Sequence, residues 1–236
     1  MIRLVLALQL MTRLPLPQVR AEEEDFAAAI RWFPATGIIV GLAVAAAMTI
    51  GLIVEPWMAA LLGLIAWVAI TGALHLDGLG DIADGVGAAH GDPAKLSAVL
   101  ADPHIGSFGV VTIVLQLLAK LVLLRLCAEH VAPIALIAVP FVARIGPLAW
   151  TLWLPPLHEG LASRFRESIS PAHLLGWTML ALAFCLIIPA LLSAAILVPL
   201  WGWWLRSRIG GISGDGHGAG IELIESGLLA ALVLAR

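Results

Sequence analysis

Three aspartates crowd one short segment of the chain, and their spacing predicts a chemical role. The segment His75–Gly85, HLDGLGDIADG, places Asp77, Asp81 and Asp84 at positions i, i+4 and i+7. On a helix these side chains fall within roughly 60° of one another, so like charges stack on one face. No Lys or Arg lies within the segment to offset them. We therefore expect a divalent cation at this face, and oxygen ligands suit Mg²⁺, Mn²⁺ or Ca²⁺.

A metal site is not the only interpretation of this face. Solvated acids at a wet helix end are the alternative, although charged residues in or beside membrane spans usually have a function. His75 could bind a metal, contact a phosphate or be a satisfied polar residue, and the last is the common fate of a lone histidine. Gly78 and Gly80 favour close approach of another helix or of a phosphate ligand.

A second group of acids lies near the C-terminus. Asp215 and Glu222 are spaced i, i+7 and would share a helical face. Asp215 ends the glycine-rich segment RIGGISGD, although glycines also serve helix packing in membranes. We expect Arg208 and Gly211 in this segment to contact a phosphate, and Asp215 to join the first cluster as a metal ligand.

The segment Ala101–Gly109, ADPHIGSFG, supplies a third group. Asp-Pro pairs at positions 92–93 and 102–103 resemble helix starts, so we predict a short helix over Pro93–Ala101 and another after Asp102. Asp102 is either a cap alone or a catalytic residue, and His104 is a candidate substrate contact.

Lys120 and Arg144 are cations inside predicted membrane spans. Such groups are costly in lipid and need partners. Either they pair with Glu222 or Glu225 inside the helix bundle, or they bind an anionic substrate, and the sequence favours neither interpretation.

Composition places the chain in the lipid bilayer. Of its 236 residues, 61% are hydrophobic and only 12% charged, about half the charged fraction of a soluble domain. The apolar residues form long runs, which indicates an integral membrane protein. No basic tract suits nucleic acid. Cys127 and Cys185 lie in different apolar runs and are expected to be buried small hydrophobes.

The apolar runs predict an all-α bundle of about seven spans in a single domain, residues 1–236. A span needs roughly 20 residues, so the longest run is split at Pro189 into two short helices. The predicted spans are Trp32–Val54, Trp57–Leu76, Gly106–Cys127, Ala132–Leu154, the two halves of Ala172–Leu205, and His217–Ala235. The N-terminal run Leu4–Met11 is too short and is expected to be interfacial.

The positions of Lys and Arg predict the orientation. With the N-terminus in the cytoplasm, most cations outside the spans lie inside: Arg3, Arg13, Arg20, Arg31, Lys95, Arg164, Arg166, Arg206 and Arg208. Only Arg125 and Arg236 lie outside. Because cytoplasmic loops are enriched in these residues, both acidic segments are expected to face the cytoplasm.

Carboxylates, glycine-rich turns and nearby arginines suit a phosphate or diphosphate held through a metal ion. Carboxylates repel phosphate directly, whereas Mg²⁺ bridges phosphoryl oxygens and neutralises charge in the transition state. A spare carboxylate can accept the proton of an attacking hydroxyl. Transfer of a phosphoryl-linked group to an alcohol, with a nucleotide leaving, needs this equipment and no covalent nucleophile.

Three stretches of the chain resemble the cobalamin synthase family, whose members are adenosylcobinamide-GDP ribazoletransferases. They are LHLDGLGDIADG (Leu74–Gly85), DPHIGSFGV (Asp102–Val110) and RIGGISGDGHGAGIEL (Arg208–Leu223). The N-terminal stretches LMTRLPLP (Leu10–Pro17) and WFPATGIIVG (Trp32–Gly41) are similar too, so the resemblance covers essentially the whole chain.

The resemblance implies a reaction, a metal and a location. A hydroxyl of α-ribazole, or of its 5′-phosphate, would attack the corrinoid-side phosphorus of GDP-activated cobinamide, and GMP would leave. Mg²⁺ is the implied metal, and the bacterial inner membrane is the implied location. We expect Asp81, Asp84 and Asp102 to be catalytic residues, and the sequence does not determine which aspartate is the base. A homo-oligomer is left open.

The chain departs from the family pattern at two places. The family usually has Lys-Asp-Ser-Arg before Ile-Gly, whereas this chain has Ala101, Asp102, Pro103 and His104, which keeps the aspartate and removes two cations. Its Pro-Tyr-Ala-Arg appears here as Pro155–His158, PPLH. Arg144 does lie where the family carries an arginine.

Two other functions compete with this interpretation. The segment Asp81–Ala89 matches half of the aspartate motif of CDP-alcohol phosphotransferases, but Ala89 replaces the usual arginine and the later aspartates do not follow at the expected spacing. A cation transporter would place acids at mid-membrane, often in repeated halves, and no repeat is visible. A purely structural scaffold would not need so many carboxylates on one membrane face.

Overall fold

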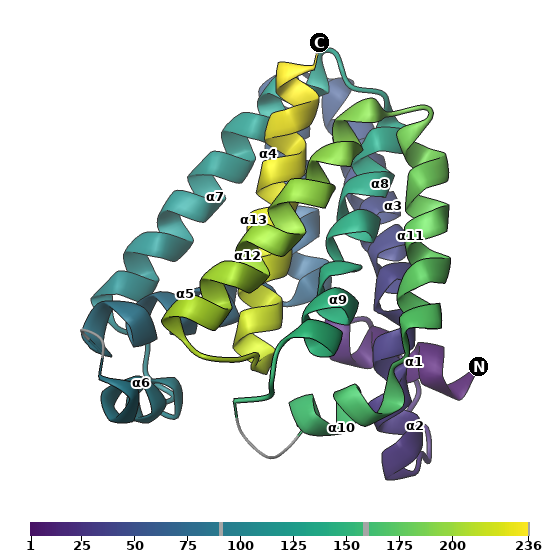
Figure 1. The fold of residues 1–236 in the computed structure, drawn as a ribbon. Helices are drawn as coiled ribbons and strands as arrows, with labels where there is room; N and C mark the ends of the chain where they lie inside the picture. The colour runs from purple at the N-terminus through teal and green to yellow at the C-terminus, as the bar shows by residue number, and fades with distance from the viewer. Residues whose placement is uncertain (90–91, 158–160, 236) are drawn as a thin grey trace.

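Helices make up nearly all of the chain that the computed structural model describes, which is residues 1–89, 92–157 and 161–235 (Figure 1). The helices are α1 (Ile2–Met11), α2 (Glu23–Ala28), η1 (Ala29–Trp32), α3 (Phe33–Leu52), α4 (Pro56–Thr71), α5 (Leu74–Ala89), α6 (Pro93–Leu100), α7 (Ser107–Ala128), α8 (Pro133–Ala143), α9 (Gly146–Trp153), α10 (Leu161–Ser168), α11 (Pro171–Cys185), η2 (Pro189–Ser193), α12 (Ala194–Arg208) and α13 (Gly214–Leu234). The predicted all-α membrane bundle is confirmed.

Five apolar segments are long enough to cross a membrane, and a sixth passes only as a bent pair of helices. The five are Glu23–Leu52, Ser107–Ala128, Pro133–Trp153, Pro189–Arg208 and Gly214–Leu234. The bent pair is α4 with α5, and α11 is an apolar helix of only 15 residues. These lengths indicate a multi-pass membrane protein, but they do not confirm the predicted count of seven.

The predicted span Trp57–Leu76 ends too late, because the chain turns before His75. Gly72 and Ala73 both have positive φ, 60° and 58°, and Gly72 is the left-handed C-cap that ends α4. After this turn α5 runs at 83° to α4 and lies across the lower end of the bundle (Figure 1). The turn therefore directs the aspartate segment away from the axis of α4.

Two other predicted breaks are confirmed. The long apolar run divides where expected, since α11 ends at Cys185 and η2 begins at Pro189. The short helix α6 begins at Pro93, and the side chain of Asp92 accepts a hydrogen bond from the backbone N–H of Ala94 at 2.9 Å. Asp92 is therefore the N-cap that the Asp-Pro pair predicted.

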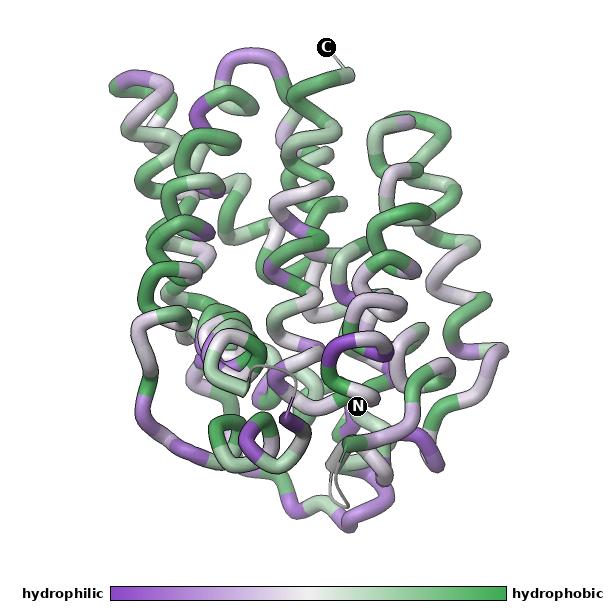
Figure 2. Tube along the Cα trace, turned by 60° about the vertical axis from the view of Figure 1, so that its left-hand side comes forward, coloured by the Kyte–Doolittle hydropathy of each residue, from purple (hydrophilic) through white to green (hydrophobic). Residues whose placement is uncertain are grey.

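Small residues let the spans approach closely. A Cβ on Gly41 in α3 would lie 2.5 Å from the Cα of Ile137 in α8, and one on Gly218 in α13 would lie 3.2 Å from the Cα of His75. Figure 2 shows hydrophobic residues along the lengths of the helices and hydrophilic ones in the loops at both ends, with many of them in the loops and short helices near the N-terminus.

Candidate functional site

The aspartates of α5 meet the beginning of α13. A Cβ on Gly78 would lie only 2.9 Å from the Cα of Asp215, so the two helices touch backbone to backbone beside the acids. Asp77 is exposed and Asp81 is half-buried. Burial, and then the negative charges of Asp215, Asp77 and Asp84, raise the pKa of Asp81 to about 6. The structure thus brings together two acidic segments that lie far apart in sequence.

Asp84 belongs to the same face but has a different neighbour. Its buried carboxylate accepts hydrogen bonds from the backbone N–H groups of Gly106, at 2.7 Å, and Gly109, at 2.9 Å. A Cβ on Gly106 would lie 2.5 Å from the Asp84 carboxylate. Asp84 therefore satisfies the first amides of α7 across 22 to 25 residues of sequence. The prediction that Asp102 starts this helix is wrong, because Gly106 is its N-cap.

Asp102 and His104 pair with each other on the exposed loop before α7. The Asp102 carboxylate accepts from the backbone N–H of His104 at 3.0 Å and lies 2.7 Å from its ring Nδ1. These hydrogen bonds from His104 lower the pKa of Asp102. Asp102 and His104 are not among the charged groups that raise the pKa of Asp81, which are Asp215, Asp77 and Asp84. Catalysis by Asp102 and substrate contact by His104 stay predictions.

A buried polar network lies next to the acids inside the bundle. Lys120 Nζ in α7 lies 2.8 Å from a carboxylate oxygen of Glu222 and 2.6 Å from one of Glu225, both in α13. Arg144, the C-cap of α8, lies 2.7 Å from the other oxygen of Glu225. Gln116 also donates to Glu222, at 2.9 Å. Two cations and two carboxylates balance here without a ligand.

The structure therefore shows Lys120 and Arg144 in the ion pairs that the sequence left as one of two possibilities. Their side chains are 2% and 0% exposed. His75 is buried beside them, with Nδ1 3.5 Å from Arg144 Nη2, while its Nε2 has no hydrogen-bond partner within the residues described. Substrate contact by these three residues stays a prediction.

The glycine-rich loop before α13 is held against another loop. Ile212 N–H donates to the carbonyl of Pro155 at 2.9 Å, and Leu157 N–H donates to the carbonyl of Ile212 at 3.0 Å. Gly211 is buried here, and a Cβ on it would lie 2.5 Å from the Pro155 oxygen. Close backbone approach explains Gly211, whereas Arg208 is exposed at the end of α12. Phosphate contact by either residue stays a prediction.

Two features of the site were missed in the sequence. Gln116 precedes Lys120 by one helical turn, and this i, i+4 polar pair in an apolar run was a readable signal for the buried network. Gly106 and Gly109 donate to Asp84 through backbone groups, which no residue type reveals. His158, part of a departure from the family pattern, lies outside the described residues.

The arrangement of the acids suits a metal site whose remaining ligands come from the substrate, rather than a site whose ligands all come from the protein. Within residues 1–89, 92–157 and 161–235, no group of three or more His, Cys, Asp or Glu side chains is placed to hold a metal ion. Mg²⁺, however, is commonly bound by one or two carboxylates together with substrate phosphates and water. The mutual repulsion around Asp81 fits such a cation.

Comparisons with known proteins agree over the whole chain. A family described as cobalamin-5-phosphate synthase matches residues 3–233. Relatives named adenosylcobinamide-GDP ribazoletransferase occur in Novosphingobium aromaticivorans, 56% identical over 98% of this chain and 95% of the relative, and in Laribacter hongkongensis, 52% identical over 98% and 96%. A third, from Thiobacillus denitrificans, is 48% identical over 98% and 94%. No solved structure matches. These matches confirm the resemblance seen in the motifs, and the chain belongs to the cobalamin-5-phosphate synthase family.

Proposed function

We propose that this chain joins GDP-activated cobinamide to α-ribazole, or to its 5′-phosphate, and releases GMP. The observation that carries the proposal is the crowding of Asp77, Asp81 and Asp215 at one end of a chain whose relatives are named for this transfer. Such crowding costs free energy unless positive charge offsets it. A divalent cation that arrives together with the diphosphate substrate would supply that positive charge and complete the site.

Each residue in the proposed mechanism has a distinct task. Asp77 and Asp215 would hold Mg²⁺, which when bound neutralises the charge of the diphosphate. Asp81 accepts the proton of the ribazole hydroxyl as the general base. The hydroxyl oxygen forms a bond to the corrinoid-side phosphorus, and the bond from that phosphorus to the GMP oxygen breaks. Asp84 positions α7 beside the acids. Metal binding by Asp81 and Asp84, and catalysis by Asp84, stay predictions.

We also propose that the end of the bundle with α5 and α6 faces the cytoplasm of a bacterial inner membrane. The N-terminus, α6, α10 and the loop before α13 all lie at this lower end, and the C-terminus lies at the upper end (Figure 1). The basic residues Lys95, Arg164 and Arg208 belong to the lower end, which agrees with the enrichment of cations in cytoplasmic loops. Assembly into a homo-oligomer stays a prediction.

The alternative functions gain no support from the site. A transporter needs ionisable groups along a path through the bilayer. The acids inside this bundle, Glu222 and Glu225, are instead neutralised by Lys120 and Arg144. The relatives are named for ribazole transfer and not for phospholipid synthesis by a CDP-alcohol phosphotransferase.

A reconstituted assay tests the proposal. Purified protein in liposomes receives Mg²⁺, GDP-activated cobinamide and α-ribazole, and GMP release is measured. A parallel reaction contains CDP-diacylglycerol and an alcohol. We expect GMP release only in the first reaction and only with a divalent cation. Turnover of CDP-diacylglycerol, or undiminished GMP release in excess chelator, would contradict the proposal.

A further inference from the structure

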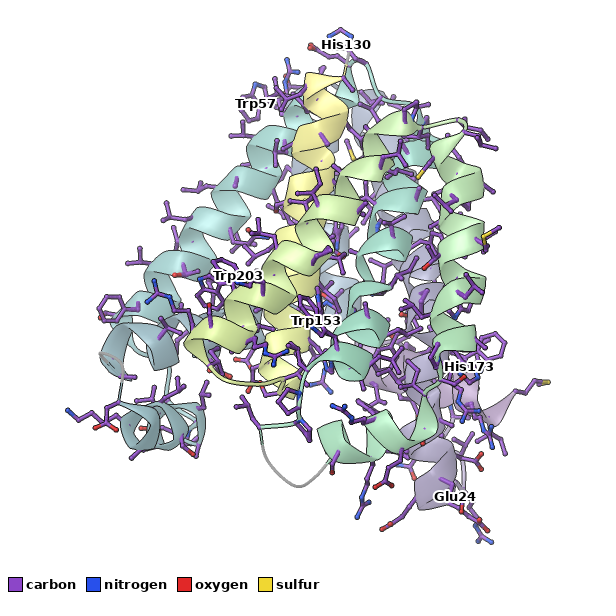
Figure 3. The ribbon with its side chains drawn as sticks, in the orientation of Figure 1. Glu24, Trp57, His130, Trp153, His173 and Trp203 are labelled. Carbon is purple, nitrogen blue, oxygen red and sulfur yellow. The ribbon has the colours of Figure 1, made fainter. Side chains whose placement is uncertain are left out.

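A cavity of about 780 Å³ lies beside the N-terminal helices, away from the aspartates. Its walls include Arg3, Arg31, His173, Trp32 and Trp177, which come from α1, η1 and α11. Figure 3 shows His173 at the lower end of α11, near the N-terminal helices, whereas α5 and α6 lie at the other side of this end in Figure 1. The chemistry proposed above uses none of these residues.

The walls of this cavity are fixed by specific contacts. Trp177 Nε1 donates to the carbonyl of Arg31 at 2.7 Å, and Arg31 Nε donates to the carbonyl of Ser168 at 2.6 Å. The rings of Trp32 and Trp177 meet edge to face, with centroids 6.2 Å apart. Two aromatic rings and one guanidinium group are thus held in a constant arrangement.

The cavity carries more positive than negative charge. Arg3 Nε donates to the carboxylate of Asp25 at 2.8 Å, and among the residues that the structure describes Asp25 is the one acid in the walls. Arg31 has a neutral carbonyl as its partner, and its terminal amino groups make no hydrogen bond in the portion of the chain that the structure describes. These two amino groups form a fork that matches the oxygens of a phosphate.

The tryptophans and the charge of the cavity together indicate its occupant. Trp32 lies directly before α3 and Trp177 in the second turn of α11, and tryptophan is enriched in membrane proteins at the level of the lipid headgroups. The apolar side chain of Ile2 is 43% exposed at the rim, where acyl chains would pass. We propose that this cavity binds an anionic phospholipid, with its phosphate on Arg31 and Arg3 and its glycerol backbone against the two tryptophans.

Lipid binding can be measured apart from catalysis. Delipidated protein in detergent is titrated with phosphatidylglycerol or with phosphatidylcholine, and bound lipid is counted by native mass spectrometry. Arg31→Gln removes the charge, Arg31→Lys keeps it, and Arg20→Gln removes an exposed arginine from the same end without touching the cavity. Inorganic phosphate in large excess is added as a competitor.

We expect phosphatidylglycerol to bind more tightly than phosphatidylcholine. Arg31→Gln should lower the affinity for phosphatidylglycerol about fivefold, which is the contribution of one cation near an anionic headgroup. Arg31→Lys keeps the charge but loses the fork, so its affinity should lie between those of Arg31→Gln and the unmodified protein, whereas Arg20→Gln should bind like the unmodified protein. If Arg31→Gln does not fold, Arg3→Gln takes its place with the same expectation. Equal weakening by Arg20→Gln, equal binding of the two lipids, or release of lipid by inorganic phosphate would each overturn the proposal.

Discussion

Asp81 and Asp84 stand one helical turn apart on α5, and their surroundings separate their roles. Asp84 is buried and accepts two backbone hydrogen bonds from α7, which stabilise its charge. Asp81 faces the other acids, so its charge is repelled and its pKa rises to about 6. Asp84 therefore stabilises the contact between α5 and α7, whereas Asp81 is disposed to bind a cation or a proton.

Replacing Asp81 by asparagine should stabilise the metal-free protein while it abolishes turnover. A folded-state pKa above the ordinary value means that ionisation destabilises the fold, so stability is lost as pH rises through about 6. In chelator, Asp81→Asn should therefore raise the Tm at pH 8 but not at pH 4. GMP release should fall about 100-fold or more, as for loss of a general base. An unchanged rate of GMP release would exclude Asp81 as the base.

Asp84→Asn is the matched control and should behave in the opposite way. The change places an amide group opposite the N–H donors of Gly106 and Gly109. The amide N–H₂ would face one of these donors and leave it unsatisfied, which costs about 1–3 kcal/mol, so the Tm should fall even at pH 8. Thermal unfolding in detergent measures both variants, and a higher Tm for Asp84→Asn would contradict its structural role.

Two contacts between helices set the geometry of the site at the scale of elements. The ion pairs of Lys120 and Arg144 join α7 and α8 to α13. The contact of Gly78 with Asp215 then joins α13 to α5. Because α5 carries Asp81, the position of its carboxylate depends on both contacts.

Breaking the charge balance of the buried network should destabilise the bundle, and restoring the balance should recover part of the loss. Lys120→Met leaves two buried carboxylates with one cation, and breaking a buried pair costs about 3 kcal/mol. Adding Glu222→Gln returns the network to one cation and one carboxylate. The Tm of the double variant should exceed that of Lys120→Met. If the Tm of Lys120→Met equals that of the unmodified protein, the network does not stabilise the fold.

Gly78→Ala should reduce turnover because its methyl group would meet the backbone of Asp215 at 2.9 Å. Backbone cannot rotate away, so α5 and α13 must separate, and a displacement of about 1 Å can cost up to about 100-fold in rate. Gly176→Ala in α11 is the control, since no heavy atom lies within 4 Å of the added carbon. GMP release is the measurement. Equal rates for the two variants would show that the close contact is not required.

In the whole molecule, the helices α5 and α6 beside the candidate site lie at the lower end of the bundle, and the C-terminus lies at the upper end. Figure 3 labels His130 at the upper end, and Lys95 belongs to α6 at the lower end. Most basic loops share the lower end with the acids, which favours a cytoplasmic location for this end. The proposed orientation of the chain rests on this asymmetry.

Cysteine labelling should confirm that topology. In a background with Cys127→Ala and Cys185→Ala, we expect His130→Cys to react with a membrane-impermeant thiol reagent in intact bacterial cells. Lys95→Cys should react only after the cells are opened. Reaction of Lys95→Cys in intact cells would reverse the orientation and place the aspartates outside.

The membrane class, the approximate spans, the breaks at Pro93 and Pro189, and the family could all be predicted from the amino-acid sequence. These follow from local hydrophobic length, caps and motifs, which need no partner elsewhere in the chain. The capping of α7 by Asp84 and the pairing of Lys120 and Arg144 became visible only in the folded chain. The turn of α5 across the bundle at Gly72 also became visible only there. These outcomes depend on contacts between distant residues, and residue type alone gives a carboxylate or a guanidinium group no particular partner.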